Sequence, residues 1–384
     1  MRYLIFMQSA CLAILAAAAL PLLAQNGGTA SDTWAHPPYV IVPSADLTTV
    51  GGYTPSQIRT AYGLAGIGNH GAGQTIALID AYDNPHAESD LGVFTAQFGL
   101  PPCTTANSCF QKIYATGVTP PVSTGWAVES SLDIEWSHAM APQAKIILVE
   151  AATAKNADLW QAVDVAVAQG ATVVSMSFGS REYASEVNAD THFNVTAVTF
   201  CASTGDSGHG AQYPAASPFV VAVGGTTLHT QTNGTWAGET AWAGSGGGTS
   251  QVEAEPSYQS GVQTTGKRGA PDVAWDADPS SGVAVYSQTG LGGWSVVGGT
   301  SVGSPSWAGL FAVVNSSRVA LRKSTLTQPQ FLLYPNAEAD YHDITSGTNG
   351  SCGAPCTAGV GYDFVTGVGS PRARLLVPAL VAAP

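Results

Sequence analysis

A run of glycine, threonine and serine near residue 300 carries a hydroxyl that could act as a nucleophile. Gly298-Gly299-Thr300-Ser301 precedes Pro305 and a long apolar stretch, so we expect a tight turn that opens into a helix, with Pro305 in its first turn. Backbone N–H groups are free at a helix start, and the positive end of the helix dipole lies behind them. A serine held there could attack a carbonyl group. On this segment alone, however, Thr300 or Ser301 as an ordinary helix cap is the commoner interpretation.

Two acidic residues four positions apart, Glu129 and Asp133, lie in a stretch that also contains Trp126 and Trp136. On a helix this spacing puts both carboxyl groups on one face. Two neighbouring carboxyls in a partly buried place share a proton and separate their pKa values, which suits a general acid and base. The competing interpretation is a solvated acidic face that also includes Glu135. The tryptophans weigh against it, because they leave this helix little polar surface.

A third acidic residue, Asp206, follows an apolar stretch that we expect to form a buried strand, residues 196–202. In parallel sheets, functional residues lie at the carboxyl ends of strands and in the loops that follow them. The surrounding sequence Gly-Asp-Ser-Gly is also good turn sequence, so a structural role competes with a functional one.

Together, the three segments resemble the sedolisin family of serine-carboxyl peptidases, enzymes with a subtilisin-like fold. The stretch 129–135 resembles the family's Glu/Asp helix, 203–208 its oxyanion-aspartate loop, and 298–305 its nucleophile segment. The resemblance covers nearly the whole chain after residue 50. It extends to three further stretches, residues 173–179, 255–259 and 270–279.

The resemblance implies a role for each residue. Ser301 would attack the peptide carbonyl, and Glu129 would take its proton as general base and return it to the leaving amine. Asp133 would hydrogen-bond Glu129 and orient it. Asp206 would donate to the oxyanion, which a carboxyl group can do only while it is protonated. We therefore expect a serine endopeptidase that cleaves polypeptides at acidic pH through an acyl-enzyme on Ser301.

Subtilisin itself is the nearest alternative. Asp80 ends the first expected buried strand, where that family keeps its triad aspartate. A subtilisin also needs a histidine that opens a helix after this strand. His70 precedes the strand, and His86 and His138 lack the expected flanking residues. We therefore interpret Asp80 as a structural residue with a secondary place in the site.

Near the C-terminus, two aspartates and several glycines suggest a cation site. By spacing alone, Asp343 and Asp363 are turn aspartates. Carboxylates and the carbonyls of glycine-rich turns are also the hard oxygen ligands that calcium prefers. The resemblance implies one structural Ca²⁺ ion, held by these two side chains and by the carbonyl groups of Ile344, Gly359 and Gly361.

The distribution of apolar residues along the chain predicts the strands and helices that position these side chains. Nearly continuous apolar strands alternate with helices, which predicts a parallel sheet covered on both faces. The predicted fold class is therefore α/β, with a mostly parallel central sheet flanked by helices, and the resemblance implies that this is a subtilisin-like three-layer fold. We expect a short helix from Pro55, strands at residues 74–80, 144–150, 171–177, 196–202 and 219–223, helices at 88–98, 126–140 and 157–169, and strands and loops over 226–300.

The first residues predict export. Met1-Arg2, an apolar stretch to Leu20 and a small residue at Ala24 are typical of a secretory signal peptide. We assign residues 1–24 to the signal peptide, 25–50 to a short leader or propeptide remnant, and 51–384 to one peptidase domain. Members of the resembled family commonly carry a long prodomain. The short leader therefore leaves a second hypothesis open, a secreted non-catalytic binding protein on a peptidase-like scaffold.

Charge and cysteine usage agree with export. Only 10% of the residues are charged and the net charge is −13, which argues against nucleic-acid binding through phosphate contacts. We expect a monomer in the extracellular space or periplasm, with no membrane contact after signal removal. Two short cysteine pairs, Cys103 with Cys109 and Cys352 with Cys356, predict local disulfides. Zinc binding is less favoured, because no second ligand pair has zinc-site spacing. Cys201, in an apolar run, is expected to be a buried free thiol.

Overall fold

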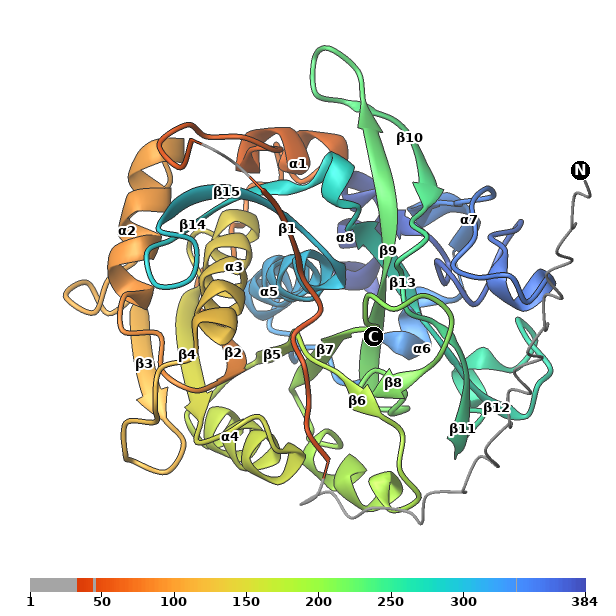
Figure 1. Cartoon of the computed structure of the whole chain (residues 1–384). Coiled ribbons are helices and arrows are strands. Elements are labelled where there is room, and N and C mark those ends of the chain that lie inside the picture. The colour runs from red at the N-terminus through yellow and green to blue at the C-terminus, as the bar shows by residue number, and fades with distance from the viewer. Residues whose placement is uncertain (1–32, 44–45, 336) are drawn as a thin grey trace, which may run out of the picture.

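The computed structural model describes residues 33–43, 46–335 and 337–384. The predicted signal peptide lies outside the described residues. A central sheet runs through the molecule with helices on both of its faces (Figure 1). The helices are α1 Pro55–Ala61, α2 Ala87–Phe98, α3 Thr124–Met140, α4 Asn156–Ala168, α5 Gly303–Ala320, α6 Gln330–Leu333, α7 Ala337–Asp340 and α8 Ala373–Ala382.

The strands form one large sheet and several small ones. In chain order they are β1 Val40–Val42, β2 Thr75–Ala81, β3 Phe110–Tyr114, β4 Lys145–Ala151, β5 Val173–Met176, β6 Ser180–Arg181, β7 Thr199–Ser203, β8 Gln212–Tyr213, β9 Val220–Thr230, β10 Trp236–Ala241, β11 Gly248–Ala254, β12 Lys267–Ala270, β13 Val273–Asp276, β14 Val283–Ser287, β15 Gly293–Gly298, β16 Tyr341–His342 and β17 Ser370–Pro371. The large sheet has the order β10-β9-β7-β5-β2-β4-β3, and β13 also pairs with β9.

All neighbours in the large sheet are parallel except β10, which runs antiparallel to β9. The predicted α/β class with a mostly parallel central sheet is therefore confirmed. The expected strands and long helices are present, with shifted ends. The strand expected from residue 196 begins at Thr199, because Ala197 adopts a positive φ of 65° and breaks the extended backbone.

Alternating side chains of β2 belong to two apolar clusters, one on each face of the sheet. Ile76 and Leu78 join the larger apolar cluster, which also holds buried residues of α2, α3 and α5. Ala77 and Ile79 join the second cluster with buried residues of α4. Successive residues of a strand point to opposite faces, so one apolar strand feeds both helical layers.

The two long helices α3 and α5 lie side by side on one face of the sheet (Figure 1). Gly309 of α5 permits their close approach, because a Cβ at that position would lie 2.5 Å from the Cβ of Met140. This packing matters for function, since α3 carries Glu129 and Asp133 and α5 begins directly after Ser301.

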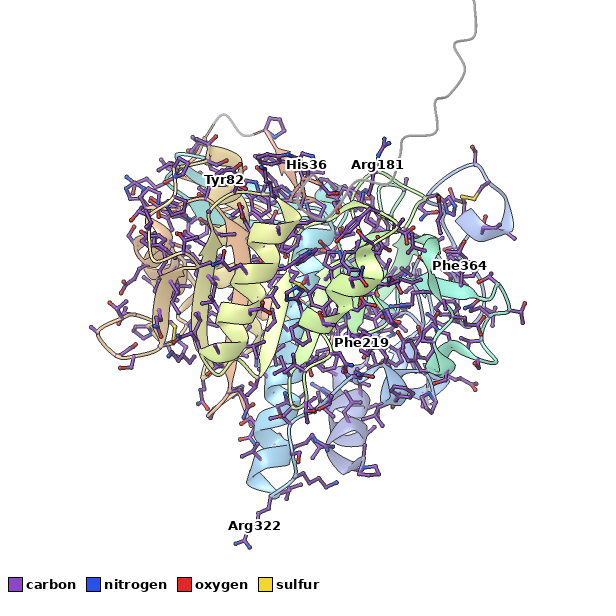
Figure 2. The ribbon with its side chains drawn as sticks, turned by 90° about the horizontal axis from the view of Figure 1, so that it is seen from below. His36, Tyr82, Arg181, Phe219, Arg322 and Phe364 are labelled. Carbon is purple, nitrogen blue, oxygen red and sulfur yellow. A yellow bond between two sulfur atoms is a disulfide. The ribbon has the colours of Figure 1, made fainter. Side chains whose placement is uncertain are left out.

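Part of the segment that we assigned to the leader forms a strand of the fold. In β1, Val40 lies opposite Gly298 of β15, and the three-stranded sheet β1-β15-β14 results. The strand crosses the front of the molecule in Figure 1 and leads back toward the carboxyl ends of the large sheet. Figure 2 shows His36 on the same edge of the molecule as Arg181, with Arg322 at the opposite end.

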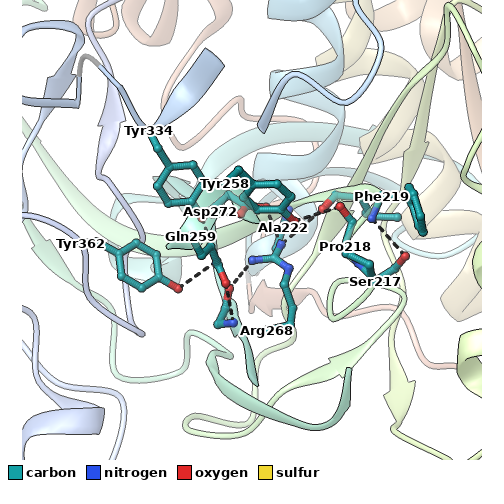
Figure 3. A network of polar contacts seen from close by, with 12 residues as sticks. Ser217, Pro218, Phe219, Ala222, Tyr258, Gln259, Arg268, Asp272, Tyr334 and Tyr362 are labelled. Carbon is teal, nitrogen blue, oxygen red and sulfur yellow. Dashed lines mark hydrogen bonds and ion pairs between the residues drawn. The ribbon is translucent and has the colours of Figure 1, made fainter. Parts of the chain in front are cut away.

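A buried ion pair lies where β12 leads into β13 (Figure 3). The Arg268 guanidinium lies 2.6 Å from Asp272 Oδ2, and both side chains are fully buried. Asp272 also accepts hydrogen bonds from the Tyr334 hydroxyl at 2.6 Å and from the amide of Ala222 in β9 at 2.8 Å. The network therefore ties the segment between β12 and β13 to β9.

Both predicted disulfides, Cys103–Cys109 and Cys352–Cys356, are present, and Cys201 is a buried free thiol. Among the described residues, no helix is both long and apolar enough to cross a membrane.

Candidate active site

The glycine-rich segment after β15 forms a single 3₁₀ turn, Thr300–Val302, that runs directly into α5. Gly299 has a φ of 106°. A side chain there would collide with Asp206 Oδ2 and with the Pro38 carbonyl oxygen, so the position requires glycine. Neither Thr300 nor Ser301 makes a side-chain cap on this turn or on α5. The helix-cap interpretation is therefore wrong, whereas Pro305 lies in the first turn of α5 as expected.

Glu129 of the neighbouring helix α3 lies beside Ser301, Asp133 lies one turn further along α3 and close to Glu129, and all three residues are fully buried. Burial raises the pKa of Glu129 well above its ordinary value, and the charges of Asp133, Asp80 and Asp206 raise it further. The nearby Ser301 hydroxyl lowers the pKa of Glu129, although no hydrogen bond of ordinary geometry joins the two side chains. Hydrogen bonds of this kind are often long before substrate binds and shorten in the complex.

Ser177, which follows β5, holds the second carboxyl of the pair. Its hydroxyl donates to Asp133 Oδ1 at 2.6 Å and also lies 3.4 Å from the Ser301 carbonyl oxygen. The pKa of Asp133 is raised by burial, and the hydrogen bond from Ser177 works against that shift. Asp133 Oδ2 and both oxygens of Glu129 find no hydrogen-bond donor in the described part of the chain. A proton carried by either carboxyl could satisfy these oxygens.

Asp206 lies beside the nucleophile turn and is oriented by Thr300. Its Oδ1 accepts hydrogen bonds from the Thr300 amide at 2.8 Å and from the Thr300 hydroxyl at 2.9 Å. Its Oδ2 is buried and unpartnered among the described residues. Burial of the carboxyl raises the pKa of Asp206 to about 7, against the opposing effect of the two bonds from Thr300. Below that pH the carboxyl carries a proton that Oδ2 can donate.

The chain's own residues 33–39 lie across this site. The Ser301 amide donates to the Pro38 carbonyl oxygen at 3.1 Å, and the same oxygen and Asp206 Oδ2 both flank the Cα of Gly299. Burial and, second, the charge of Glu129 raise the pKa of Tyr39 to about 12. A carbonyl oxygen therefore already lies beside the amide and the carboxyl that would bind an oxyanion.

Asp80 belongs to the same group of carboxyls. It lies in β2, is 1% exposed, and neither of its oxygens has a hydrogen-bond partner within the described residues. Its pKa is raised by burial and then by the charge of Asp133. The three histidines considered for a subtilisin triad bond elsewhere: His70 to Arg59, His86 to Thr289 and His138 to the Pro101 carbonyl.

The residues predicted to bind calcium gather in one loop region. Asp343 Oδ2 accepts from the Gly361 amide at 2.9 Å, and Asp363 Oδ2 accepts from the Gly359 amide at 2.9 Å. Ile344, which follows Asp343, is buried. The donor set of two carboxylates and three carbonyls consists entirely of hard oxygen atoms, so its chemistry fits a calcium ion.

Two residues that orient the site, Ser177 and Thr300, were not predicted from the sequence to do so; Thr300 was considered only as a helix cap. Ser177 could have been found, because it stands at the carboxyl end of a predicted buried strand, where functional residues of a parallel sheet gather. The contact between Thr300 and Asp206 joins residues 94 positions apart, and no local pattern predicts it.

Comparisons with known proteins bear on the family and the fold of the chain. The sequence profile of the subtilase family matches residues 122–339. Sedolisin from Pseudomonas sp. (strain 101) is 30% identical over 364 residues, which cover 84% of this chain and 60% of the relative. Kumamolisin from Bacillus sp. (strain MN-32) is 32% identical over 367 residues, which cover 86% and 64% respectively. The chain thus spans about three fifths of the length of these curated relatives.

A solved structure of Pseudomonas sedolisin, a serine-carboxyl proteinase in complex with two molecules of pseudo-iodotyrostatin, superposes on this fold with a TM-score of 0.75. It is 29% identical in sequence, and the match covers 86% of this chain and 98% of that one.

Proposed function

The chain belongs to the sedolisin family of serine-type peptidases, and on that premise we propose that it is a secreted serine-carboxyl endopeptidase active at acidic pH. The observation that carries the proposal is that the Ser301 amide and Asp206 Oδ2 both lie beside one carbonyl oxygen, that of Pro38, while Glu129 lies beside the Ser301 hydroxyl. The relatives' names support peptide-bond hydrolysis. The chain retains all four side chains that the reaction needs, Ser301, Glu129, Asp133 and Asp206. Their presence gives no support to the alternative of a non-catalytic binding protein.

In the proposed reaction, Ser301 Oγ attacks the carbonyl carbon of the substrate and Glu129 accepts its proton. The carbonyl oxygen becomes an oxyanion, which the Ser301 amide and the protonated Asp206 stabilise by hydrogen bonds. Asp133, held by Ser177, orients Glu129. Glu129 then gives its proton to the departing amine, and the acyl group stays on Ser301 as an ester. Water, deprotonated by Glu129, hydrolyses that ester and restores the serine.

The raised pKa of Asp206 supports acidic operation. The carboxyl keeps its proton below about pH 7 and loses it above, and a carboxylate in this place would repel the oxyanion instead of stabilising it. Activity should therefore decline as the pH rises through 7.

The chain's own residues 33–38 occupy the place of a substrate, so a polypeptide must displace them before it can be cleaved.

Secretion is supported by the sequence at residues 1–24 and by the two disulfides, which form in oxidising compartments.

We also propose one calcium ion at Asp343 and Asp363, with the carbonyls of Ile344, Gly359 and Gly361. A bound calcium ion would supply charge neutralisation and rigidity to this loop, away from the reacting atoms.

Cleavage of a denatured protein by the purified full chain between about pH 3 and 7 tests the proposed activity. The Ser301→Ala variant is the control. We expect cleavage that is strongest on the acidic side and absent in the variant. Equal cleavage by both proteins, or none by the wild type at any pH in this range, would overturn the proposal.

A further inference from the structure

The loop between β16 and β17 carries two cysteines that lie beside a histidine from a distant part of the chain. The Sγ atoms of Cys352 and Cys356 and a ring nitrogen of His209 lie within 4.8 Å of one another. His209 and Cys352 are exposed, so small molecules and ions can reach them. Two cysteines with three residues between them have the spacing of one half of a zinc site. In the fold, His209 supplies a further ligand that the local spacing does not predict.

Backbone hydrogen bonds hold the cysteine loop closed without help from the disulfide. The Asn349 amide donates to the Cys356 carbonyl oxygen at 3.0 Å, and the Ala358 amide donates to the Gly347 carbonyl oxygen at 3.1 Å. Both bonds belong to a short antiparallel pairing across the loop. Breaking the bond between the two sulfur atoms would therefore free them without opening the loop.

His209 is fixed against the same loop. Its amide donates to the Asn349 carbonyl oxygen at 2.7 Å. The two segments are in contact at Gly350, where a Cβ would lie 2.9 Å from Cys356 Sγ and 3.2 Å from the His209 Cβ. Because the backbone of both segments is held in place, rotation of the side chains is enough to gather the imidazole and the two sulfur atoms around one ion.

We propose that Cys352, Cys356 and His209 bind one Zn²⁺ ion when the disulfide between the two cysteines is reduced. Two thiolates and one imidazole are ligands that zinc prefers, and water would fill the fourth position. The ion would tie the segment that follows Asp206 to the cysteine loop. This metal site does not depend on the proposed peptidase function.

The electrons for the reduction come from a dithiol. One thiolate of the reductant attacks the exposed Cys352 Sγ, the bond between the two cysteines breaks, and Cys356 leaves as a thiolate. The second thiolate of the reductant then closes a disulfide within the reductant and releases Cys352. Each cysteine sulfur takes up one proton, and both protons are released again when zinc binds.

Metal titration gives the first test. Cys103 and Cys109 also lie near a histidine, so the full chain carries Cys103→Ser and Cys109→Ser, is reduced with a dithiol and is desalted without oxygen. Cobalt(II) replaces zinc, because its bonds to thiolates produce a charge-transfer absorption. We expect this absorption to saturate at one equivalent in the reduced protein, to disappear when zinc is added, and to be absent from the oxidised protein. A reduced protein without this absorption would overturn the inference.

Two histidine variants in the same background test the third ligand. His209→Gln removes it, and His229→Gln, which removes another exposed histidine, is the control. Competition with a zinc indicator should show an affinity loss of more than about a hundredfold for His209→Gln, since loss of a mere second-shell partner costs up to about that much, and no loss for His229→Gln. Equal affinities of the two variants would contradict His209 as a ligand.

Hydrogen exchange then tests the tie between the two segments. The His209 amide is the donor to Asn349, so its exchange reports whether the contact opens. In the reduced protein zinc should slow this exchange at least about tenfold, and in the oxidised protein it should have no effect. An unchanged exchange rate in the reduced protein would refute the tie. Neither measurement uses a substrate, so a failure of the proposed peptidase activity leaves both conclusive.

Discussion

Replacing Asp206 by asparagine should separate the hydrogen-bond role of this carboxyl from its need for a proton. Asp206 Oδ1 already accepts both bonds from Thr300, and Oδ2, beside the Pro38 carbonyl, has no hydrogen-bond partner within the described ranges. An asparagine in the same rotamer keeps its oxygen on Thr300 and presents an NH₂ group to the oxyanion. That group donates at every pH, whereas the carboxyl donates only when protonated.

The magnitude follows from the pKa of Asp206, which is about 7. The protonated fraction is near one at pH 5, about one tenth at pH 8 and about one hundredth at pH 9. The ratio of kcat/KM at pH 8 to that at pH 5 should therefore be about tenfold larger in Asp206→Asn than in the wild type. Asp206→Ala, which removes the donor altogether, should lose about 10²- to 10³-fold at pH 5.

The assay is a pH–rate profile of the three proteins on one fluorogenic peptide, with thermal unfolding recorded at each pH. The raised pKa makes stability fall as the pH rises from 3.8 toward 7, because the unfolded chain releases this proton first. The stability of Asp206→Asn relative to the wild type should therefore increase over that range. Identical pH–rate profiles for the wild type and Asp206→Asn would refute a protonated Asp206 as the oxyanion donor.

Three further changes test other parts of the structure. Glu129→Gln keeps the shape of the side chain but cannot take a proton, so kcat should fall about 10²- to 10⁴-fold with an unchanged circular dichroism spectrum, and retained turnover would rule out Glu129 as the base. Arg268→Ala leaves Asp272 buried without its ion partner (Figure 3), so urea unfolding should reveal a loss of about 3 to 5 kcal/mol, and a loss below about 1 kcal/mol would count against the pair. Chelation of calcium should lower the melting temperature of the wild type but not of Asp343→Ala, and an equal response of both proteins would argue against the proposed ion.

The sequence predicted the scaffold well, because its signals are local. The apolar strands and the four-residue spacing of Glu129 and Asp133 gave the parallel sheet and α3 with errors of a few residues at their ends. The largest difference is at β9, which continues to Thr230, whereas the predicted strand ended at residue 223. The additional residues pair with β13 and β10, and a pattern within the strand itself does not predict that pairing.

The contacts that orient the site were harder to predict, because they join distant segments. The hydroxyl of Thr300 could cap a helix according to its own neighbours, but Asp206 binds it instead. Likewise, Pro37 and Pro38 have no periodic pattern and mark only an extended leader. Their place beside Ser301 depends on main-chain hydrogen bonds that the preceding residues make with Gly179 and Ala154. These contacts join distant segments, and no local sequence signal predicts them.

The central claim, a serine activated by carboxyl groups, is tested most directly by looking for the covalent intermediate. The full chain is mixed with a peptide ester at about pH 4 and quenched with acid, and the peptide that contains Ser301 is examined by mass spectrometry. We predict an added acyl mass on Ser301 in the wild type and none in Ser301→Ala. Product formation without any adduct on Ser301 would contradict the account, because it would mean that the paired carboxyls activate water directly.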